Sequence, residues 1–431
     1  MHDVIGWRCA VCGTHVDLLD PAPWRCPRST LEDRHHVLQA ISATTTPSHP
    51  VTPPDTADAR SEQPFVRHDR RLAWAAAAAA RGMTAPARRA LVEELDAAVR
   101  EVDGVGFRST PFARSDRLSD ELGFSSAGGV WIKDETGGVA GSQKARHLFT
   151  ILLHLRACEL LGVLDARPRL AIASCGNAAL AAATLARAAD WPIDVYVPTW
   201  MSDGFGDRLD ALGADVHRCP RRDDDPPGDP AMYRFREAVD AGAIPFTVQG
   251  PENALCLDGG RTIGWELGEQ IVAPDGPGEL DAVYVQVGGG AFVTCLGAGL
   301  IEMGHRIPIM AVQAEGCAPL GRAWRIDATA DDDWAEVMPP WPDPSSLADG
   351  ILDDEAYDWI GALDAMRATE GDMVVVEEHR IGRAHELAHA AGFDASPTGT
   401  AGLAGLLQWL EDTDRRHSDL RVAVVMSGVT R

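Results

Sequence analysis

The residue of this sequence best suited to covalent chemistry is a lysine between a glycine-rich turn and a long apolar segment. Residues 131–147 read WIKDETGGVAGSQKARH, and Lys144 precedes the apolar segment 148–161. An amine at the start of a helix faces the positive end of the helix dipole, which favours its neutral form. A neutral amine is the form that makes a Schiff base with an aldehyde. On this segment alone a surface lysine after a turn is the better interpretation, so other residues have to decide.

A triple glycine after the expected strand DAVYVQV is a candidate phosphate site. Glycines between a strand and a helix leave backbone N–H groups free and close enough to hold an anion. Tight packing of a strand on a helix also uses glycine, so the pattern alone is weak. No G-x-G-x-x-G stands there and no G-x-x-x-x-G-K-[ST] occurs, which argues against a dinucleotide or a nucleotide-triphosphate loop. The candidate residues are Gly288, Gly289, Gly290 and Ala291.

Two other strand ends carry polar residues. After the expected strand 170–174, free backbone N–H groups could hold a carboxylate at Ser174, Cys175 and Gly176. The amide of Asn177 could donate to a ring oxygen, or its side chain could cap the next helix. Ser427 and Gly428 follow the last expected strand.

Two patterns resemble metal sites. Cys9-x-x-Cys12 followed by Cys26-x-x-Ser29 lacks the fourth thiolate of a zinc ribbon. One of His15, His35 and His36 could complete a zinc tetrahedron, although none has the ribbon spacing, and a degenerate knuckle that folds without metal stays open. Residues 385–389, HELAH, match the H-E-x-x-H pattern of zinc proteases. Glu411 lacks the motif context of a third ligand, so we expect these histidines to face solvent or to pack on a sheet.

The elements that position these residues alternate between strands and helices from residue 107 onward, which predicts an α/β fold with parallel sheets. We expect two open parallel-sheet domains with helices on both faces. Residues 1–41 form a cysteine knuckle and 42–64, rich in Pro, Ser and Thr, a linker. The larger domain takes residues 65–150 and 255–431, and the smaller one residues 151–254.

Composition limits the classes of partner. The chain has 431 residues and a net charge of −25, which argues against nucleic acid and against an anionic membrane surface. No apolar run approaches the length of a membrane span, and no signal segment opens the chain. Nine cysteines, an odd number, suit free thiols rather than a disulfide framework. We therefore expect a cytoplasmic protein.

The order of the motifs resembles the fold-type II pyridoxal-phosphate enzymes, and among them the threonine synthases and threonine dehydratases. STPFARSDRLSDELG, WIKDETGGVAGSQKAR and SCGNAA are similar to their entry, lysine and asparagine segments. LDGGRTIGWELGEQI, VQAEGCAPL and the cysteine-bearing N-terminus resemble threonine synthases, whereas SLADGI and VVMSG resemble dehydratases. The likeness runs from about Phe107 to the end of the chain.

The resemblance implies pyridoxal 5′-phosphate as cofactor and a role for each candidate. Lys144 would carry the cofactor and then act as base; Asn177 would bind the ring hydroxyl; the triple-glycine loop would bind the phosphate. Ser427 would contact the pyridine nitrogen, which a serine cannot keep protonated as a carboxylate would, and this suits elimination or replacement at the β-carbon. Residues 174–176 would hold the carboxylate of an amino-acid substrate. A homodimer is expected from the resemblance alone.

Departures from the family pattern leave the substrate open. Gln143 replaces the usual Phe beside the lysine, Ala178 follows Asn177, and the phosphate loop is GGGA. Arg146 matches a basic family position and, with Gln143, is a candidate for contact with the substrate side chain. We predict a lyase or synthase that acts on a hydroxyl- or phospho-activated amino acid, as threonine synthase does. The alternatives are a β-replacement enzyme of a specialised pathway, a threonine or serine dehydratase, and a cofactor-binding regulatory relative.

Overall fold

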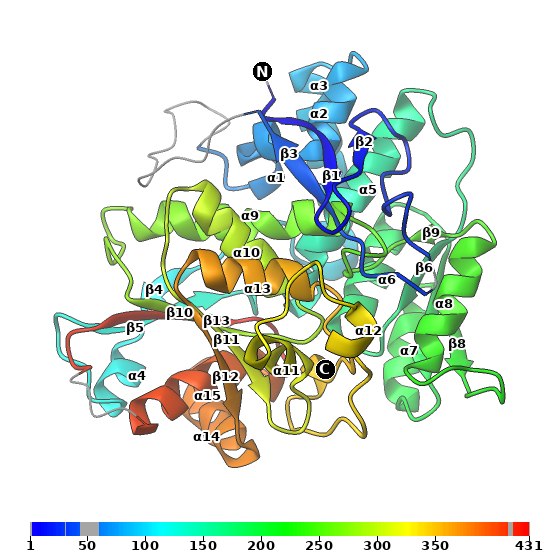
Figure 1. The fold of residues 1–431 in the computed structure, drawn as a ribbon. Helices are drawn as coiled ribbons and strands as arrows, with labels where there is room; N and C mark the ends of the chain where they lie inside the picture. Colours follow the sequence, from blue (N-terminus) through cyan, green and yellow to red (C-terminus); the bar gives the residue numbers. More distant parts are fainter. Residues whose placement is uncertain (1, 31, 44–59, 413–416, 431) are drawn as a thin grey trace.

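The computed structural model describes residues 2–30, 32–43, 60–412 and 417–430. They form three sheets: a small N-terminal one, a six-stranded one and a four-stranded one (Figure 1). The prediction of an α/β fold with two parallel sheets is confirmed, because strands and helices alternate along most of the chain and both larger sheets are mainly parallel. Residues 44–59, most of the predicted linker, lie outside the described residues.

The six-stranded sheet is covered by helices on both faces. Its order is β12 (Asp372–Val376), β11 (Ile309–Ala314), β10 (Ala282–Gln286), β13 (Arg421–Met426), β5 (Gly129–Asp134) and β4 (Phe112–Arg114). All neighbours are parallel except β4, which pairs antiparallel with β5. One face packs on α9 (Leu255–Ile271), α10 (Ala291–Glu302) and α13 (Trp359–Ala368), and the other on α14 (Glu378–Ala390) and α15 (Pro397–Asp412) (Figure 1).

Both faces of this sheet are apolar, as burial on two sides requires. In β10, Val283 and Val285 belong to the core under α10, whereas Ala282 and Tyr284 belong to the core under α15. Because all five parallel strands end at the same edge, the residues that follow β5, β10 and β13 lie close together.

The four-stranded sheet is fully parallel. Its order is β8 (Asp215–Cys219), β7 (Ile193–Pro198), β6 (Leu170–Ala173) and β9 (Ile244–Pro245). The helices around it are α5 (Lys144–Leu160), α6 (Asn177–Ala188), α7 (Asp203–Ala211) and α8 (Pro230–Asp240) (Figure 1). These strands lie within the predicted smaller domain, 151–254, but the division into domains stays a prediction.

The sequence PFTVQ of residues 245–249 predicts a strand, but only its first residue belongs to one. Strand β9 ends at Pro245 and lies at the edge of the sheet, where a residue without an N–H is tolerated. After Phe246 donates to the carbonyl of Ala171 (2.8 Å), the chain turns toward the six-stranded sheet. There the N–H of Gly250 donates to the carboxylate of Asp358 (3.0 Å).

The N-terminal sheet consists of β2 (His15–Asp17), β1 (Val4–Cys9) and β3 (Leu38–Ser42), all antiparallel. It packs beside the alanine-rich helix α2 (Ala73–Ala80); Gly82, with φ +95°, follows that helix and precedes α3 (Ala85–Asp103). Within the described ranges every helix is too short or too polar to cross a bilayer.

Candidate active site

Lys144 is the first residue of α5, and two hydrogen bonds join the turn before it to the C-terminal segment. The N–H of Gln143 donates to the carbonyl of Ser427 (3.1 Å), and the N–H of Val429 donates to the carbonyl of Gly141 (2.9 Å). These two bonds bring the predicted Schiff-base lysine beside the end of β13, although the two segments are almost 300 residues apart in sequence.

Lys144 is also the one lysine whose amine is free for chemistry. The sequence holds two lysines, Lys133 and Lys144. The amine of Lys133 is fully buried and donates to the carbonyl of Thr110 (2.9 Å), to Oε1 of Gln270 (2.9 Å) and to the carboxylate of Glu266. An ammonium has three donors, so those of Lys133 are all used within the protein.

Asn177, which follows a strand of the four-stranded sheet, also lies beside the C-terminal segment. It begins α6, and a Cβ built on Gly428 would lie 2.7 Å from its Nδ2 and 2.9 Å from Cβ of Ser142. Only glycine fits at 428, because a side chain there would displace both neighbours. Asn177 does not cap α6 through a side-chain bond, since the N-cap is Gly176.

Ser427 has a polar neighbour that the sequence analysis missed. Its Oγ accepts a hydrogen bond from Nε2 of Gln286, the last residue of β10, and Nε2 also donates to the carbonyl of Gly399 (3.1 Å). Because Gln286 fills an acceptor position of the serine oxygen, the hydroxyl proton of Ser427 is left to donate elsewhere. A glutamine buried in an otherwise apolar strand was the available signal.

The triple-glycine loop lies against the side chain of Asp353. Gly290, with φ +94°, caps α10, and its conformation requires glycine. A Cβ built on Gly288 would lie 2.3 Å from Oδ2 of Asp353, and the carbonyl of Gly289 accepts from the N–H of Asp358 (2.8 Å). Binding of a phosphate by this loop stays a prediction.

Asp353 and Asp358 are functional candidates that sequence reasoning did not find. Burial lowers the pKa of the Lys144 amine, an effect that these two carboxylates partly oppose. Burial raises the pKa of Asp353, and it raises the pKa of Asp358 to about 7. Neither aspartate belongs to a spacing pattern, so only the fold reveals their place.

Several buried polar atoms around Lys144 lack a hydrogen-bond partner within the protein. Their shared feature is a position on the segments that meet at the lysine. They are Ser142 Oγ, Gln143 Oε1, Asn177 Oδ1, Gln286 Oε1 and Asp358 Oδ1. Buried polar groups normally have partners, so such a group of unpaired atoms marks a place that a bound molecule completes.

The predicted carboxylate loop lies at the end of β6. Ser174, Cys175 and Gly176 are half-buried, and Oγ of Ser174 accepts from the N–H of Gly176 (3.2 Å). The hydroxyl thus shapes the turn that leads into α6. Binding of a carboxylate by this loop stays a prediction.

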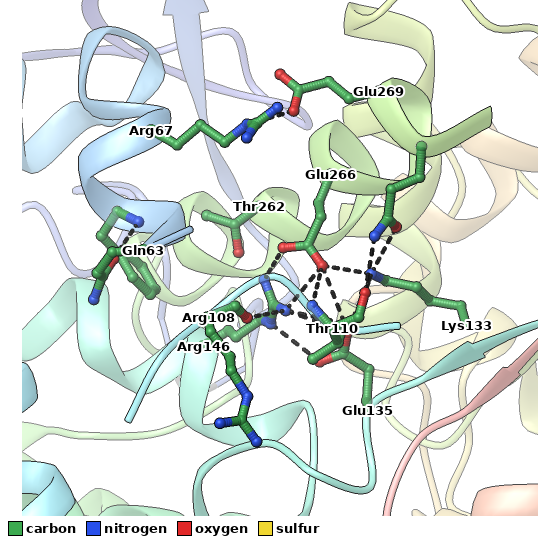
Figure 2. Close-up of polar contacts among 12 residues, drawn as sticks. Gln63, Arg67, Arg108, Thr110, Lys133, Glu135, Arg146, Thr262, Glu266 and Glu269 are labelled. Carbon is green, nitrogen blue, oxygen red and sulfur yellow. Dashed lines mark hydrogen bonds and ion pairs between the residues drawn. The ribbon is translucent and has the colours of Figure 1, made fainter. Parts of the chain in front are cut away.

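Arg146 lies in a buried network of ion pairs (Figure 2). Its guanidinium lies between Glu135 (Nε–Oε2, 3.0 Å) and Glu266 (Nη1–Oε2, 3.1 Å). Lys133 supplies the second positive charge of the network, so two cations face two carboxylates. Burial alone would raise the pKa of Glu266, but the pairs with Arg146 and Lys133 hold it well below its usual range. The charge of Arg146 is neutralised within the protein, and contact with a substrate stays a prediction.

The H-E-x-x-H segment lies on α14, far along the chain from these residues. The helix packs through Ile381, Ala384 and Ala388, whereas His389 is exposed and His385 half-buried. The two rings meet edge to face, with centroids 4.5 Å apart. The pair lies on the partly exposed side of the helix, as expected.

A family model described as pyridoxal-phosphate dependent enzyme matches residues 105–428. This range includes Lys144, Asn177, the triple-glycine loop and Ser427. The chain belongs to the pyridoxal-phosphate dependent enzymes. The predictions of the family, of an enzyme and of pyridoxal phosphate as cofactor are confirmed.

Individual relatives differ in the reaction that their names give. A rat protein named serine dehydratase-like is 30% identical over 48% of this chain and 59% of its own length, so this chain spans little more than half of that relative. A threonine synthase from Bacillus sp. (strain ULM1) is 24% identical over 74% of this chain and 81% of its own length. The structure of diaminopropionate ammonia lyase from Escherichia coli aligns with a TM-score of 0.60 at 16% identity, covering 79% of this chain and 89% of that one. The last likeness shows the fold alone.

The residues around Lys144 fit a pyridoxal-phosphate enzyme. Three glycines precede the N-terminus of α10, the lysine amine has a lowered pKa, and unpaired polar atoms surround it. A phosphate, an aldehyde and a ring with polar substituents would satisfy these three features in turn.

Proposed function

We propose that this enzyme binds its cofactor covalently through Lys144 and eliminates a group from the β-carbon of an amino acid. The observation that carries the proposal is the Gln286–Ser427 pair at the end of the sheet. The free hydroxyl proton of Ser427 donates to the ring nitrogen of the cofactor without transferring a charge to it. When bound, the cofactor takes up electrons from the α-carbon, and an uncharged ring does so weakly. Reactions in which a leaving group at the β-carbon accepts those electrons suit such a site best.

Each remaining residue has a stated task in this proposal. The amine of Lys144 accepts the α-proton, which its lowered pKa favours at neutral pH. The N–H groups of residues 288–291 hold the cofactor phosphate, and the amide of Asn177 donates to the ring hydroxyl oxygen. The N–H groups of residues 174–176 hold the substrate carboxylate.

The charges near Lys144 limit the kind of leaving group that the site can accept. Asp353 and Asp358 lie near Lys144, and the charge of Arg146 is already paired with Glu135 and Glu266. A second phosphate, as in a phosphorylated substrate, would therefore meet carboxylates and no free cation among these residues. We propose a hydroxyl or amino leaving group, as in serine, threonine or 2,3-diaminopropionate. Beside carboxylates, a neutral or cationic group has a more favourable electrostatic energy than a phosphate dianion has.

A substrate panel tests the proposal. The purified enzyme would be incubated with serine, threonine, 2,3-diaminopropionate, O-acetylserine and phosphohomoserine, with Lys144→Ala as the inactive control. We expect a keto acid and ammonia from at least one of the first three, and no phosphate from phosphohomoserine. Release of phosphate with formation of threonine would establish a synthase instead. A new amino acid formed only when a second nucleophile is added would establish β-replacement.

A further inference from the structure

Three cysteines and a histidine converge in the N-terminal sheet. Among the residues that the structure describes, these three thiols and one imidazole are the group close enough to share a metal ion, with all four ligand atoms within 4.8 Å of one another. Sγ of Cys9 lies 3.4 Å from Nδ1 of His36, and the thiols of Cys12 and Cys26 lie 3.6 Å apart. Zinc–sulfur bonds of about 2.3 Å in a tetrahedron place two sulfurs about 3.8 Å apart. The observed spacings match that geometry, and the cysteines are free thiols.

The groups around these four side chains hold them in a ligand orientation. Nε2 of His36 lies 2.9 Å from a carboxylate oxygen of Asp33, which leaves Nδ1 without a proton and directed at the thiols. The N–H of Arg28 donates to Sγ of Cys26 (3.5 Å), and Oγ1 of Thr14 lies 3.1 Å from Sγ of Cys12. A carboxylate behind a histidine and donors beside thiolates are the usual surroundings of bound zinc.

Burial and ligand number indicate a structural ion. Cys9, Cys26 and His36 are buried and Cys12 is half-buried, so four protein ligands close the site. A catalytic zinc keeps a position for water, whereas a structural one has four protein ligands. The sheet has three short strands, and a metal would join the end of β1, the segment just before β3, and the segment between Cys12 and Cys26.

The segment between Cys26 and β3 also contacts residues 355–359, which border the triple-glycine loop. His35, next to His36, accepts from Nε1 of Trp359 (3.0 Å), and its other nitrogen lies 3.4 Å from the carboxylate of Glu355. Both oxygens of Glu355 accept from Arg34 (2.7 and 2.9 Å). Glu355 and Trp359 flank Asp358, whose N–H binds Gly289.

We propose that Cys9, Cys12, Cys26 and His36 bind one zinc ion, and that this ion, through Arg34 and His35, fixes segment 353–359 against the cofactor-binding loop. The metal site stands on its own ligands. Its effect on the cofactor rests on the proposed function of the triple-glycine loop.

Metal content tests the site without using activity. Protein produced with zinc and then dialysed should hold one zinc per chain, and cobalt put in its place should show the visible and near-ultraviolet bands of a tetrahedral thiolate complex. Cys12→Ser and His36→Ala should lose the metal, whereas Cys12→His, which keeps a ligand, and Cys219→Ser, a buried cysteine elsewhere, should retain it. Asp33→Asn should lower zinc affinity about tenfold to a hundredfold. Wild-type protein that holds no metal, or holds iron instead, overturns the proposal.

A chelator separates the two parts of the proposal. Removal of zinc from the wild-type protein should weaken binding of pyridoxal phosphate at least tenfold while the far-ultraviolet circular dichroism changes little. If the metal leaves and the cofactor binds as before, the link to the glycine loop is wrong and the zinc site stands. Lys144→Ala should keep its zinc, so failure of the proposed function would leave the metal result intact.

Discussion

The carboxylate of Asp353 lies beside Gly289, in the loop that we propose holds the cofactor phosphate. A Cβ built on the neighbouring Gly288 would lie 2.3 Å from Oδ2 of Asp353, so the carboxylate is in close contact with the loop. A phosphate bound at this loop and an ionised Asp353 would repel each other. Asp353 must therefore turn away or take up a proton when a phosphate binds.

Removal of this carboxylate should strengthen phosphate binding. We expect Asp353→Asn to bind pyridoxine 5′-phosphate, which lacks the aldehyde, about tenfold more tightly, a gain of about 1.4 kcal/mol. Burial raises the pKa of Asp353, so the wild-type protein should also bind this ligand more tightly as pH falls, and the variant should lose that dependence. Asp354→Asn is the matched control, because its carboxylate faces Gly228 instead. Equal affinity in all three proteins at pH 6 and 8 would contradict this role.

The lowered pKa of Lys144 should appear in the kinetics of cofactor attachment. Burial lowers this pKa, so the amine becomes neutral at lower pH than a free lysine, whose pKa is about 10.4. The rate of appearance of visible absorbance after mixing with pyridoxal phosphate should rise with pH to a midpoint below that value. Asp353→Asn removes a charge that raises the pKa, so its midpoint should fall further. A midpoint near that of free lysine would show an exposed, unperturbed amine.

The Gln286–Ser427 pair should decide the type of reaction. Ser427→Ala should retain the cofactor but lower kcat for elimination by about tenfold to a hundredfold, a loss of one hydrogen bond to a polar group. Ser427→Asp should place a charge at the ring nitrogen and divert turnover toward racemisation or transamination. Products would be measured by chiral chromatography. A Ser427→Asp enzyme with the same product ratio as the wild type would show that Ser427 does not decide the type of reaction.

Removal of a carboxylate from the ion network of Figure 2 should lower the free energy of unfolding. Glu266→Gln leaves Arg146 and Lys133 sharing one carboxylate in a buried site, which typically costs about 3–5 kcal/mol. Glu269→Gln, which breaks a more exposed pair with Arg67, should cost less than about 1.5 kcal/mol. Because the pKa of Glu266 is lowered in the fold, its contribution is fully present above pH about 4.3 and is lost as pH falls below that value. Urea unfolding of both variants is the check, and equal midpoints would contradict the network's role.

The meeting of Lys144, Asn177 and Ser427 could be predicted because each follows a strand or opens a helix. Parallel strands end at a common edge, so short motifs far apart in sequence had to gather there. Arg146 shows the limit of local reasoning. Its place beside Lys144 suggested substrate contact, yet its partner Glu266 comes from a helix 120 residues away. Similarly, His36 has no ribbon spacing, and it reaches the cysteines because β3 pairs with β1. Such contacts depend on tertiary packing, which spacing along the chain does not encode.

Reduction of the cofactor-loaded enzyme with borohydride, followed by peptide mass spectrometry, tests the central claim most directly. The chain has two lysines. The amine of Lys133 donates to three protein acceptors, so the amine of Lys144 is the one available for reaction. We predict one pyridoxyl phosphate group per chain, on Lys144 and absent from Lys133. No modified lysine, or modification of Lys133 with Lys144 intact, would contradict it.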